Sequence, residues 1–402
     1  MSNSIITIIK NCGLVDLETG KVVENVTIAV RDDTIAEVTD RDLSGSRVID
    51  LDGFYIMPGL INVHNNLSLV FPFKLTNPNE PESVTVLRCY RRAYDALLAG
   101  VTCLRTVGEI HRVDIHLRNM INAGWIEGPR IIAGGKGLGV TGGHGSSFGQ
   151  VEADGAEEFR KAARRELALG ADHLKIFITG GIAKLEEEFG EMQMTKDEIA
   201  AVTSVARSRG TYVAAHIGGS TAIIEAAEAG VTSFEHGYII NREAAKAIKE
   251  VSGYLVPTLS VTRSEEWMRA NNFEEWTIYK ALSIKDRHME SIKLAISEGV
   301  TLVCGTDIPP GDLNEGINAT VREIEFIKEA GLNELEAIRT ATINAAKLCR
   351  MENKVGLVKP GYKADLIAVP RNPLKDIRQI ERIKFVMKGG EIIRNDIRTK
   401  EI

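Results

Sequence analysis

Residues 57–70 read MPGLINVHNNLSLV, an apolar run that becomes polar at His64, Asn65 and Asn66. A short apolar run bounded by glycine and polar residues is typical of a strand that is buried on both faces. Because side chains alternate along a strand, His64 and Asn66 would point to the same side. The run therefore predicts a buried strand whose end directs two polar side chains at one place.

Seven further runs of this kind follow, and amphipathic, helix-like segments such as residues 197–210 and 220–230 lie between them. Buried strands that alternate with helices are typical of a parallel sheet, and eight such units predict an α/β fold of the (β/α)8 TIM barrel type. The eight runs are IMPGLINVH, VTCLRTVG, PRIIAGG, HLKIFITGG, TYVAAHI, TSFEHG, YLVPTLS and TLVCGTD.

The two ends of the chain have a different pattern. Residues 1–56 and 355–402 alternate apolar and polar side chains and carry Gly and Asp turns, which is typical of antiparallel strands. Neither end is long enough to form a stable sheet alone. We therefore expect the ends to pair as a small β-sandwich domain beside a barrel domain of residues 57–354.

Composition narrows the function. The 402 residues carry a formal net charge of −6 and no long basic run, so we expect neither nucleic acid nor a membrane surface as a partner. The N-terminus lacks a signal-peptide pattern, which favours a cytoplasmic location. The five cysteines are scattered and form no C-x-x-C pair, so we expect reduced, buried thiols rather than disulfides.

Potential metal ligands fall at the ends of the predicted strands. In a barrel of this type, the loops that follow the strands converge on the active site. Imidazole nitrogens and carboxylate oxygens are suitable ligands for zinc, and a catalytic site keeps one position open for water. The side chains in these positions are His64, Lys175, His216, His236 and Asp307.

The motifs MPGLI-x-x-H, HLKIFITGGI, VAAHIGGS, SFEHGYII and CGTDIPP together resemble the amidohydrolase superfamily. The branch that looks most similar contains zinc-dependent Xaa-Pro and Xaa-Arg dipeptidases and imidazolonepropionase-like proteins. The resemblance implies that Lys175 is carboxylated and bridges two metal ions. It further implies that His216 and His236 bind the second ion, that Asp307 binds the first and accepts a proton from the catalytic water, and that His144 contacts the substrate.

The chain departs from this pattern at Asn66, where the family carries the second imidazole of a His-x-His motif. A carboxamide oxygen is a weaker zinc ligand than an imidazole nitrogen. We therefore expect one firm metal site, formed with Lys175, and a second that is weak or absent, with Co²⁺ or Mn²⁺ as alternatives to Zn²⁺. We also weigh Asn66 as a metal ligand or as a residue that holds a water.

Two further departures concern the substrate. Thr106 replaces an Asp of the family, and Gly218 replaces a Tyr that contacts the substrate carboxylate, which puts recognition of a peptide C-terminus in doubt. Tyr238 is a candidate replacement for that hydroxyl. The acidic run at residues 186–188 is expected to be mainly a solvated face, although it could belong to a loop near the site.

These observations predict a metal-dependent hydrolase that cleaves an amide, cyclic amide or related C–N bond in a small molecule, with dipeptides and N-acyl amino acids among the possible substrates. An aminohydrolase (deaminase) on the same scaffold is one alternative. A catalytically weakened ligand-binding homologue is the other, and Asn66 alone motivates it. The family resemblance also leads us to expect a homo-oligomer.

Overall fold

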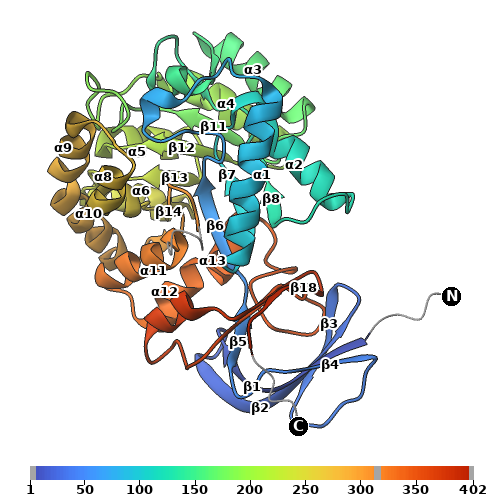
Figure 1. Ribbon diagram of the computed structural model, residues 1–402. Helices are drawn as coiled ribbons and strands as arrows, with labels where there is room; N and C mark the ends of the chain where they lie inside the picture. Colours follow the sequence, from blue (N-terminus) through green and yellow to red (C-terminus); the bar gives the residue numbers. More distant parts are fainter. Residues whose placement is uncertain (1–5, 312–317, 398–402) are drawn as a thin grey trace.

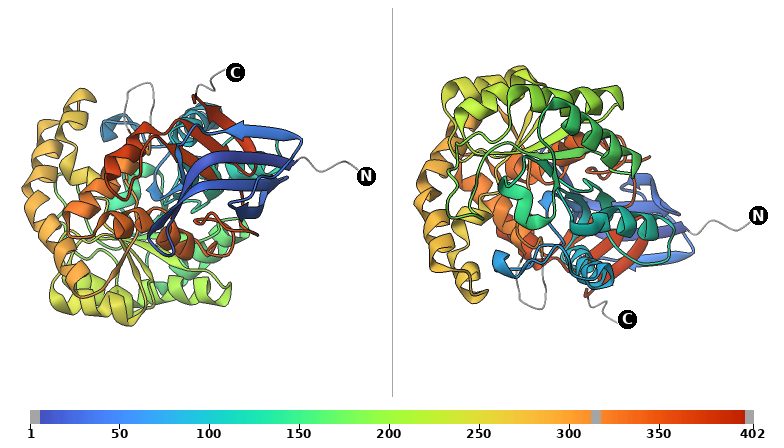
Figure 2. Two further views of the ribbon diagram at one scale, coloured as in Figure 1. Left: turned by 90° about the horizontal axis from the view of Figure 1, so that it is seen from below. Right: turned by 90° about the horizontal axis from the view of Figure 1, so that it is seen from above.

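The computed structural model describes residues 6–311 and 318–397, so residues 1–5 and 398–402 of the expected terminal domain lie outside it. The chain forms a strand-and-helix body and, beside it, a sheet domain built from both ends of the chain (Figure 1). Two further views show the helices around the strands of the body (Figure 2).

The sheet domain joins the two ends of the chain. Its strand order is β18-β17-β16-β5-β1-β2-β3, with β4 paired to β1, and the antiparallel pairing of β5 with β16 links the N-terminal and C-terminal segments. Its apolar side chains form a core of their own, which includes Ile28, Ile56 and Phe385. The strands are β1 (Ile6–Asp16), β2 (Lys21–Arg31), β3 (Thr34–Thr39), β4 (Arg47–Asp50), β5 (Tyr55–Pro58), β16 (Leu366–Val369), β17 (Phe385–Lys388) and β18 (Glu391–Asn395).

Each of the eight predicted buried runs forms a strand in the helical body. The strands are β6 (Leu60–Asn65), β7 (Val101–Thr106), β8 (Arg130–Ile132), β11 (Leu174–Phe177), β12 (Val213–Ile217), β13 (Ser233–His236), β14 (Tyr254–Val256) and β15 (Thr301–Leu302). Two short strands, β9 (Leu138–Gly139) and β10 (Val151–Glu152), extend one of the sheets.

These strands pair in parallel, which gives a TIM-barrel-type α/β fold. The described pairings form two sheets, β6-β7-β8 and β10-β9-β11-β12-β13-β14-β15, rather than one closed ring. Backbone hydrogen bonds from Val63 to Cys304 and from Asp307 to His64 join β6 to the segment that follows β15. This junction brings the end of the first strand beside the end of the last one.

Helices separate the strands. In the described ranges they are α1 (Glu82–Leu98), α2 (Val113–Asn122), α3 (Ala156–Ala168), α4 (Lys196–Ser208), α5 (Ser220–Glu228), α6 (Arg242–Glu250), α7 (Ser260–Arg263), α8 (Glu265–Ala270), α9 (Glu275–Ser283), α10 (Lys285–Ser297), α11 (Ala319–Glu329), α12 (Glu334–Thr340) and α13 (Ile343–Leu348). The short 3-10 helices are η1 (Phe73–Leu75), η2 (Ile110–Arg112), η3 (His144–Phe148) and η4 (Ile377–Arg382).

Helix α4 illustrates why these segments are helical. The hydroxyl of Thr195 accepts a hydrogen bond from the backbone of Glu198, and the Glu198 side chain in turn accepts one from the backbone of Thr195. This capping box satisfies amides that the first turn leaves free. Ile199, Val202 and Ala206 then recur at helical spacing on the buried face.

The first predicted run divides at Gly59 between the two parts of the molecule. Residues before Gly59 pair in the sheet domain as β5, and those after it begin the body as β6. A Cβ atom at Gly59 would lie only 2.3 Å from Oγ1 of Thr102, so a larger residue would not fit. The ion pair between Arg130 and Asp365, with an Nε to Oδ2 distance of 2.7 Å, also joins the two parts. The exact domain boundaries, 56/57 and 354/355, remain a prediction.

One prediction from composition, that of buried and unpaired cysteines, can be compared with the structure. The five cysteines are buried and free. No helix in residues 6–311 or 318–397 is long and apolar enough to cross a membrane.

Candidate active site and metal centre

The candidate site residues meet in one open cavity at the ends of the strands. The cavity encloses about 860 Å³ of empty space, including space open to solvent. The predicted residues that line it are His64, Asn66, His144, Lys175, His216, His236, Tyr238 and Asp307.

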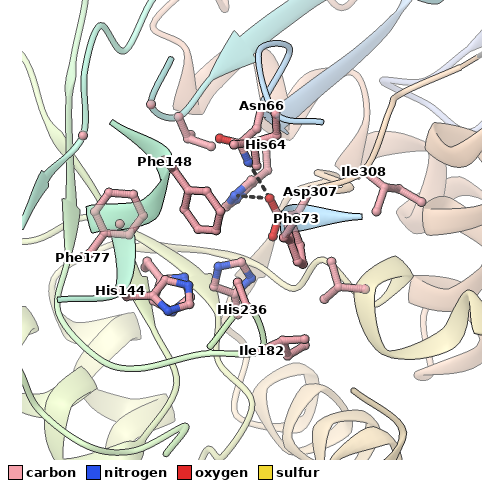
Figure 3. A pocket seen from close by; sticks show the side chains of 18 of the residues that line it. His64, Asn66, Phe73, His144, Phe148, Phe177, Ile182, His236, Asp307 and Ile308 are labelled. Atoms are coloured by element: carbon pink, nitrogen blue, oxygen red, sulfur yellow. Dashed lines mark hydrogen bonds and ion pairs between the residues drawn. The ribbon is translucent and has the colours of Figure 1, made fainter. Parts of the chain in front are cut away.

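His64 and Asn66 approach the same carboxylate, as their shared face of the strand predicts. Nε2 of His64 lies 3.3 Å from Oδ1 of Asp307, and the amide nitrogen of Asn66 donates a 2.5 Å hydrogen bond to the same oxygen. Figure 3 shows both side chains directed at Asp307. The structure therefore brings the ends of β6 and β15 together around Asp307.

A buried ion pair fixes the His64 ring. Nδ1 of His64 lies 2.7 Å from Glu235, and Glu235 accepts hydrogen bonds of 2.8 and 3.0 Å from Arg105. Burial alone would raise the pKa of Glu235, but the Arg105 guanidinium and His64 hold it well below its usual range. A negative partner at Nδ1 favours a proton on that nitrogen and leaves the Nε2 lone pair facing Asp307.

His236 is held in a similar way from the other side. Its Nδ1 lies 2.7 Å from the hydroxyl of Thr258, and burial lowers the pKa of the imidazole well below its usual value, which favours the neutral form that binds metals. His236 and Asp307 adopt left-handed backbone conformations, with φ of 73° and 56°. Such conformations are unfavourable for residues other than glycine and are concentrated at functional sites.

His64, His236 and Asp307 form a group of side chains that could hold a metal ion. One candidate ligand atom from each lies within 4.8 Å of the others, close enough to share one ion. Two imidazole nitrogens and a carboxylate oxygen are a suitable donor set for zinc or a similar divalent ion. The residues present therefore fit the metal ion that the sequence predicts.

Lys175 lies in the cavity but has almost no contact with solvent. Its side chain is 1% exposed, and its Nζ is 5.2 Å from the centre of the Phe177 ring. Burial lowers the pKa of Lys175 to about 8, although Glu235 and Asp307 act in the opposite direction. A larger fraction of neutral amine is what reaction with CO₂ requires, so Lys175 is suited to the carboxylation that the family resemblance implies.

His216 is in the cavity but outside this group. Its ring stacks on His144 at 4.2 Å between centroids and meets His236 at 4.5 Å. Its Nε2 lies 3.3 Å from the carbonyl oxygen of Gly180. Its predicted role as a ligand, together with Lys175, therefore stays a prediction.

The acidic run at residues 186–188 was expected to be mainly solvated, and this prediction is wrong for its middle residue. Glu187 is 8% exposed, and its carboxylate lies 2.5 Å from Nδ1 of His144, whereas Glu186 and Glu188 are exposed. The loop after β11 contributes Ile182 and Ala183 to the cavity lining, and within the acidic run Glu187 is the buried residue. Burial opposes ionisation, but the hydrogen bond from His144 lowers the pKa of Glu187 below its usual value.

The two departures at substrate-related positions, Thr106 and Gly218, and the candidate Tyr238 have defined surroundings. Thr106 donates a 2.7 Å hydrogen bond to Asp114. A Cβ at Gly218 would lie 1.9 Å from the carbonyl oxygen of Phe189, so no side chain fits there. Tyr238 is 2% exposed and stacks parallel to His236 at 5.2 Å, so it borders the cavity.

The sequence did not indicate several residues of this site. Glu235 and Arg105 stand inside quoted strand motifs, directly before His236 and Thr106, but an acid or base inside one motif does not reveal its partner on another strand. Glu109, which accepts hydrogen bonds of 2.7 and 2.8 Å from the backbone of Leu67 and Ser68, holds the loop after β6. A group of aromatic side chains, Phe71, Phe73, Phe148, Trp267 and Phe273, also lines the cavity.

The chain is similar in sequence and structure to several known proteins. The sequence profile of the amidohydrolase family matches residues 55–393. Ochratoxinase from Aspergillus niger is 30% identical over 340 residues, which is 76% of this chain and 68% of that protein. Imidazolonepropionase from Kosmotoga olearia is 22% identical over 396 residues, 92% of this chain and 91% of that protein. A crystal structure of a Xaa-Pro dipeptidase with bound methionine is 30% identical, with a TM-score of 0.88, and covers 97% of this chain and 100% of its own.

Proposed function

The chain belongs to the amidohydrolase family and is a hydrolase that acts on C–N bonds, and we propose that it cleaves an amide bond in a small molecule with a metal-activated water. The observation that carries this proposal is the convergence of His64, His236 and Asp307 within 4.8 Å, in the cavity that Lys175 and His216 also line.

Two of the side chains that would hold the metal, His64 and His236, have one ring nitrogen already bound to a neighbouring side chain. His64 and His236 would bind through Nε2, because Nδ1 of each faces Glu235 or Thr258. Carboxylated Lys175, His216 and His236 would form one firm site, and the site of His64 and Asp307, beside Asn66, would be weak. A divalent ion bound there lowers the pKa of a water molecule toward neutrality and polarises the scissile carbonyl.

Asp307 is the residue we assign to proton transfer. The described contacts of its carboxylate, with His64 and Asn66, both use Oδ1. Oδ2 would therefore take the proton from the attacking water and deliver it to the leaving nitrogen. Asn66 and His64 restrain the carboxylate, which keeps this oxygen directed at the reacting atoms.

His144 is the residue we assign to the substrate. It precedes Gly145 at the start of η3, lines the cavity and has Nδ1 bound to Glu187. With Nδ1 bound to the Glu187 carboxylate, Nε2 would face the carbonyl of the scissile bond and would donate to its oxygen when the ring carries a proton on both nitrogens. The ring of His216 stacks against it and limits its rotation.

The test is turnover by the purified protein, loaded with Zn²⁺, Co²⁺ or Mn²⁺, on a panel of N-acyl amino acids, dipeptides, lactams and uncharged amides. We expect amide cleavage, and Asp307→Asn should lower kcat by about 10²- to 10⁴-fold, the usual contribution of a general base. Release of ammonia alone would favour deamination instead. No turnover across the panel, with ligand binding intact, would favour a ligand-binding homologue.

Carboxylation of Lys175 can be tested independently of activity. Protein equilibrated with ¹³C-labelled bicarbonate and zinc should give a carbamate carbon signal by NMR, and Lys175→Met should lose it. A wild-type protein that binds zinc without this signal would contradict the assignment of Lys175.

A further inference from the structure

One side of the cavity is an aromatic wall, which we define as Phe71, Phe73, Phe148, Trp267 and Phe273. Phe71 and Phe73 come from the loop after β6, Phe148 ends η3, and Trp267 and Phe273 belong to α8 and the turn after it. Three segments that are distant in sequence therefore place aromatic rings on the same cavity.

The rings of the wall contact one another directly. The centroid of Phe71 lies 5.1 Å from Trp267, and the centroid of Phe73 lies 5.7 Å from Phe148 and 5.4 Å from Phe273. These spacings are those of packed edge-to-face and tilted pairs, which fix the orientation of the rings. The wall is therefore a preformed surface rather than a set of independent side chains.

The wall continues to the candidate catalytic residues. Phe148 lies 6.2 Å from His144 between ring centroids, and Figure 3 shows Phe73 and Phe148 lining the same cavity as His144 and Asp307. Phe71, Phe73, Phe148 and Trp267 are only half-buried, although they belong to an aromatic cluster. Apolar ring surface left open beside reacting groups is what an apolar part of a substrate would cover.

The cavity offers almost no positive charge to a free carboxylate. Among the described lining residues arginine is absent, and the one lysine is Lys175, which we assign to the metal centre. Asp307 and Glu109 are acids that line the same space. A substrate carboxylate placed on the aromatic wall would lose its hydration without gaining a counter-ion, which is unfavourable.

Three cations near this cavity, Lys184, Lys280 and Arg92, donate hydrogen bonds to backbone carbonyl groups. Nζ of Lys184 donates to the carbonyl oxygens of Gly142 and Gly143 at 2.9 and 2.7 Å. Lys280 donates to the carbonyl oxygen of Glu187 at 2.5 Å. Arg92 lies over the Phe71 ring at 5.6 Å, but its guanidinium donates to the Leu67 carbonyl at 2.8 Å.

From the aromatic wall and this charge distribution, we propose that the site takes an uncharged amide that carries an aryl group, rather than a dipeptide or N-acyl amino acid with a free carboxylate. The aryl group would lie on the wall and the amide carbonyl would face His144 and Asp307. This inference rests on the proposed amide hydrolysis and names its substrate class.

The first test uses two amides that differ only in a carboxylate, N-benzoylphenethylamine and N-benzoylphenylalanine. Both present the same amide bond and the same two rings. We expect kcat/KM for the uncharged compound to be about tenfold higher or more, because the carboxylate has no partner in the cavity. A tenfold preference for N-benzoylphenylalanine, or equal values for the two, would overturn the inference and leave amide hydrolysis standing.

The second test measures binding without turnover. In Asp307→Asn, N-benzoylphenethylamine should change tryptophan fluorescence through Trp267, and Phe73→Leu in that background should weaken the binding about tenfold. Trp267→Phe should abolish the signal. The control is Trp125→Phe, which removes an indole that is 74% exposed and outside the cavity lining, and it should preserve the response.

The two tests separate the inference from the proposed function. Tight binding of the uncharged compound by a protein that hydrolyses no amide would overturn the function and support the substrate class. Hydrolysis that Phe73→Leu and Trp267→Leu leave unchanged, with circular dichroism confirming a folded protein, would overturn the role of the wall.

Discussion

The side-chain amide nitrogen of Asn66 lies 2.5 Å from Oδ1 of Asp307 and donates a hydrogen bond to it. In the His-x-His pattern that this chain resembles, position 66 carries a second imidazole. Here the group that faces the carboxylate is a donor N–H, which has no lone pair to offer a metal ion. Asn66 is thus suited to orienting Asp307, and the cluster of candidate ligands comprises His64, His236 and Asp307.

Restoring an imidazole should add a metal site. After dialysis against a mild chelator, we expect the wild-type protein to retain a single zinc equivalent and Asn66→His to retain a second, because imidazole binds zinc more tightly than a carboxamide. Atomic absorption or native mass spectrometry measures both. Asn79→His, at an exposed position, is the matched control and should add none. Two zinc ions retained by the wild type would contradict the assignment of a weak site beside Asn66.

The buried cysteines predict slow thiol chemistry. Burial raises the pKa of Cys12 and Cys349 to about 12, and it raises the pKa values of Cys89, Cys103 and Cys304 well above the usual value. Because the thiolate is the reactive form, a disulfide reagent at pH 8 should leave the native protein almost unmodified and should titrate five thiols in denaturant. One rapidly reacting thiol in the native protein would contradict this burial.

The strands and most of the candidate ligands could be predicted from the sequence. Each buried run carries its own pattern, and the barrel architecture places strand ends together whatever the loops do. His64, Lys175, His216, His236 and Asp307 line one cavity for this reason. The two ends of the chain alternate apolar and polar residues, and this pattern does not suit a strand that is buried on both faces. The sequence therefore also predicts that the ends form a sheet separate from the parallel strands.

The aromatic wall and Glu187 could not be predicted in the same way. Phe73, Phe148 and Phe273 come from loops and short helices without a period, and only tertiary packing brings them to one surface. Glu187 is buried between two exposed glutamates, and nothing in the sequence of three identical residues distinguishes it from them. The ion pair between Glu235 and Arg105 joins β13 to β7, which belong to different sheets, and neither sequence motif specifies a partner on such a distant strand.

Removing the negative partner of Arg105 should destabilise the fold. Glu235 and Arg105 are fully buried, so Glu235→Gln would leave an unpaired guanidinium and should cost about 3–5 kcal/mol of unfolding free energy in urea. Glu228→Gln, which breaks the exposed pair with Lys196, is the control and should cost at most about 1 kcal/mol. Equal effects of the two substitutions would contradict the structural role of the buried pair.

The stability that Glu235 provides should depend on pH in one direction. Its pKa is held below the usual value in the folded protein, so its contribution is fully present above its unfolded pKa of about 4.3 and is lost as the pH falls toward the folded pKa. The difference in unfolding free energy between wild type and Glu235→Gln should therefore stay constant at neutral pH and shrink in acid. A difference that grows in acid would contradict the ionised state of Glu235.

Glu187 should act as a positioning residue through His144. Its carboxylate lies 2.5 Å from Nδ1 of His144 and also accepts a 2.9 Å hydrogen bond from Gln193. Glu187→Gln weakens the charged contact and allows the ring to turn, so we expect kcat to fall about tenfold, the low end of what a misplaced catalytic group costs. KM and the melting temperature should change little, and Glu187→Asp should restore part of the rate.

Glu188→Gln, one residue away and exposed, should leave kcat unchanged. A loss of stability that accounts for the loss of rate, or an equal effect of Glu188→Gln, would show that the contact between Glu187 and His144 only supports the loop.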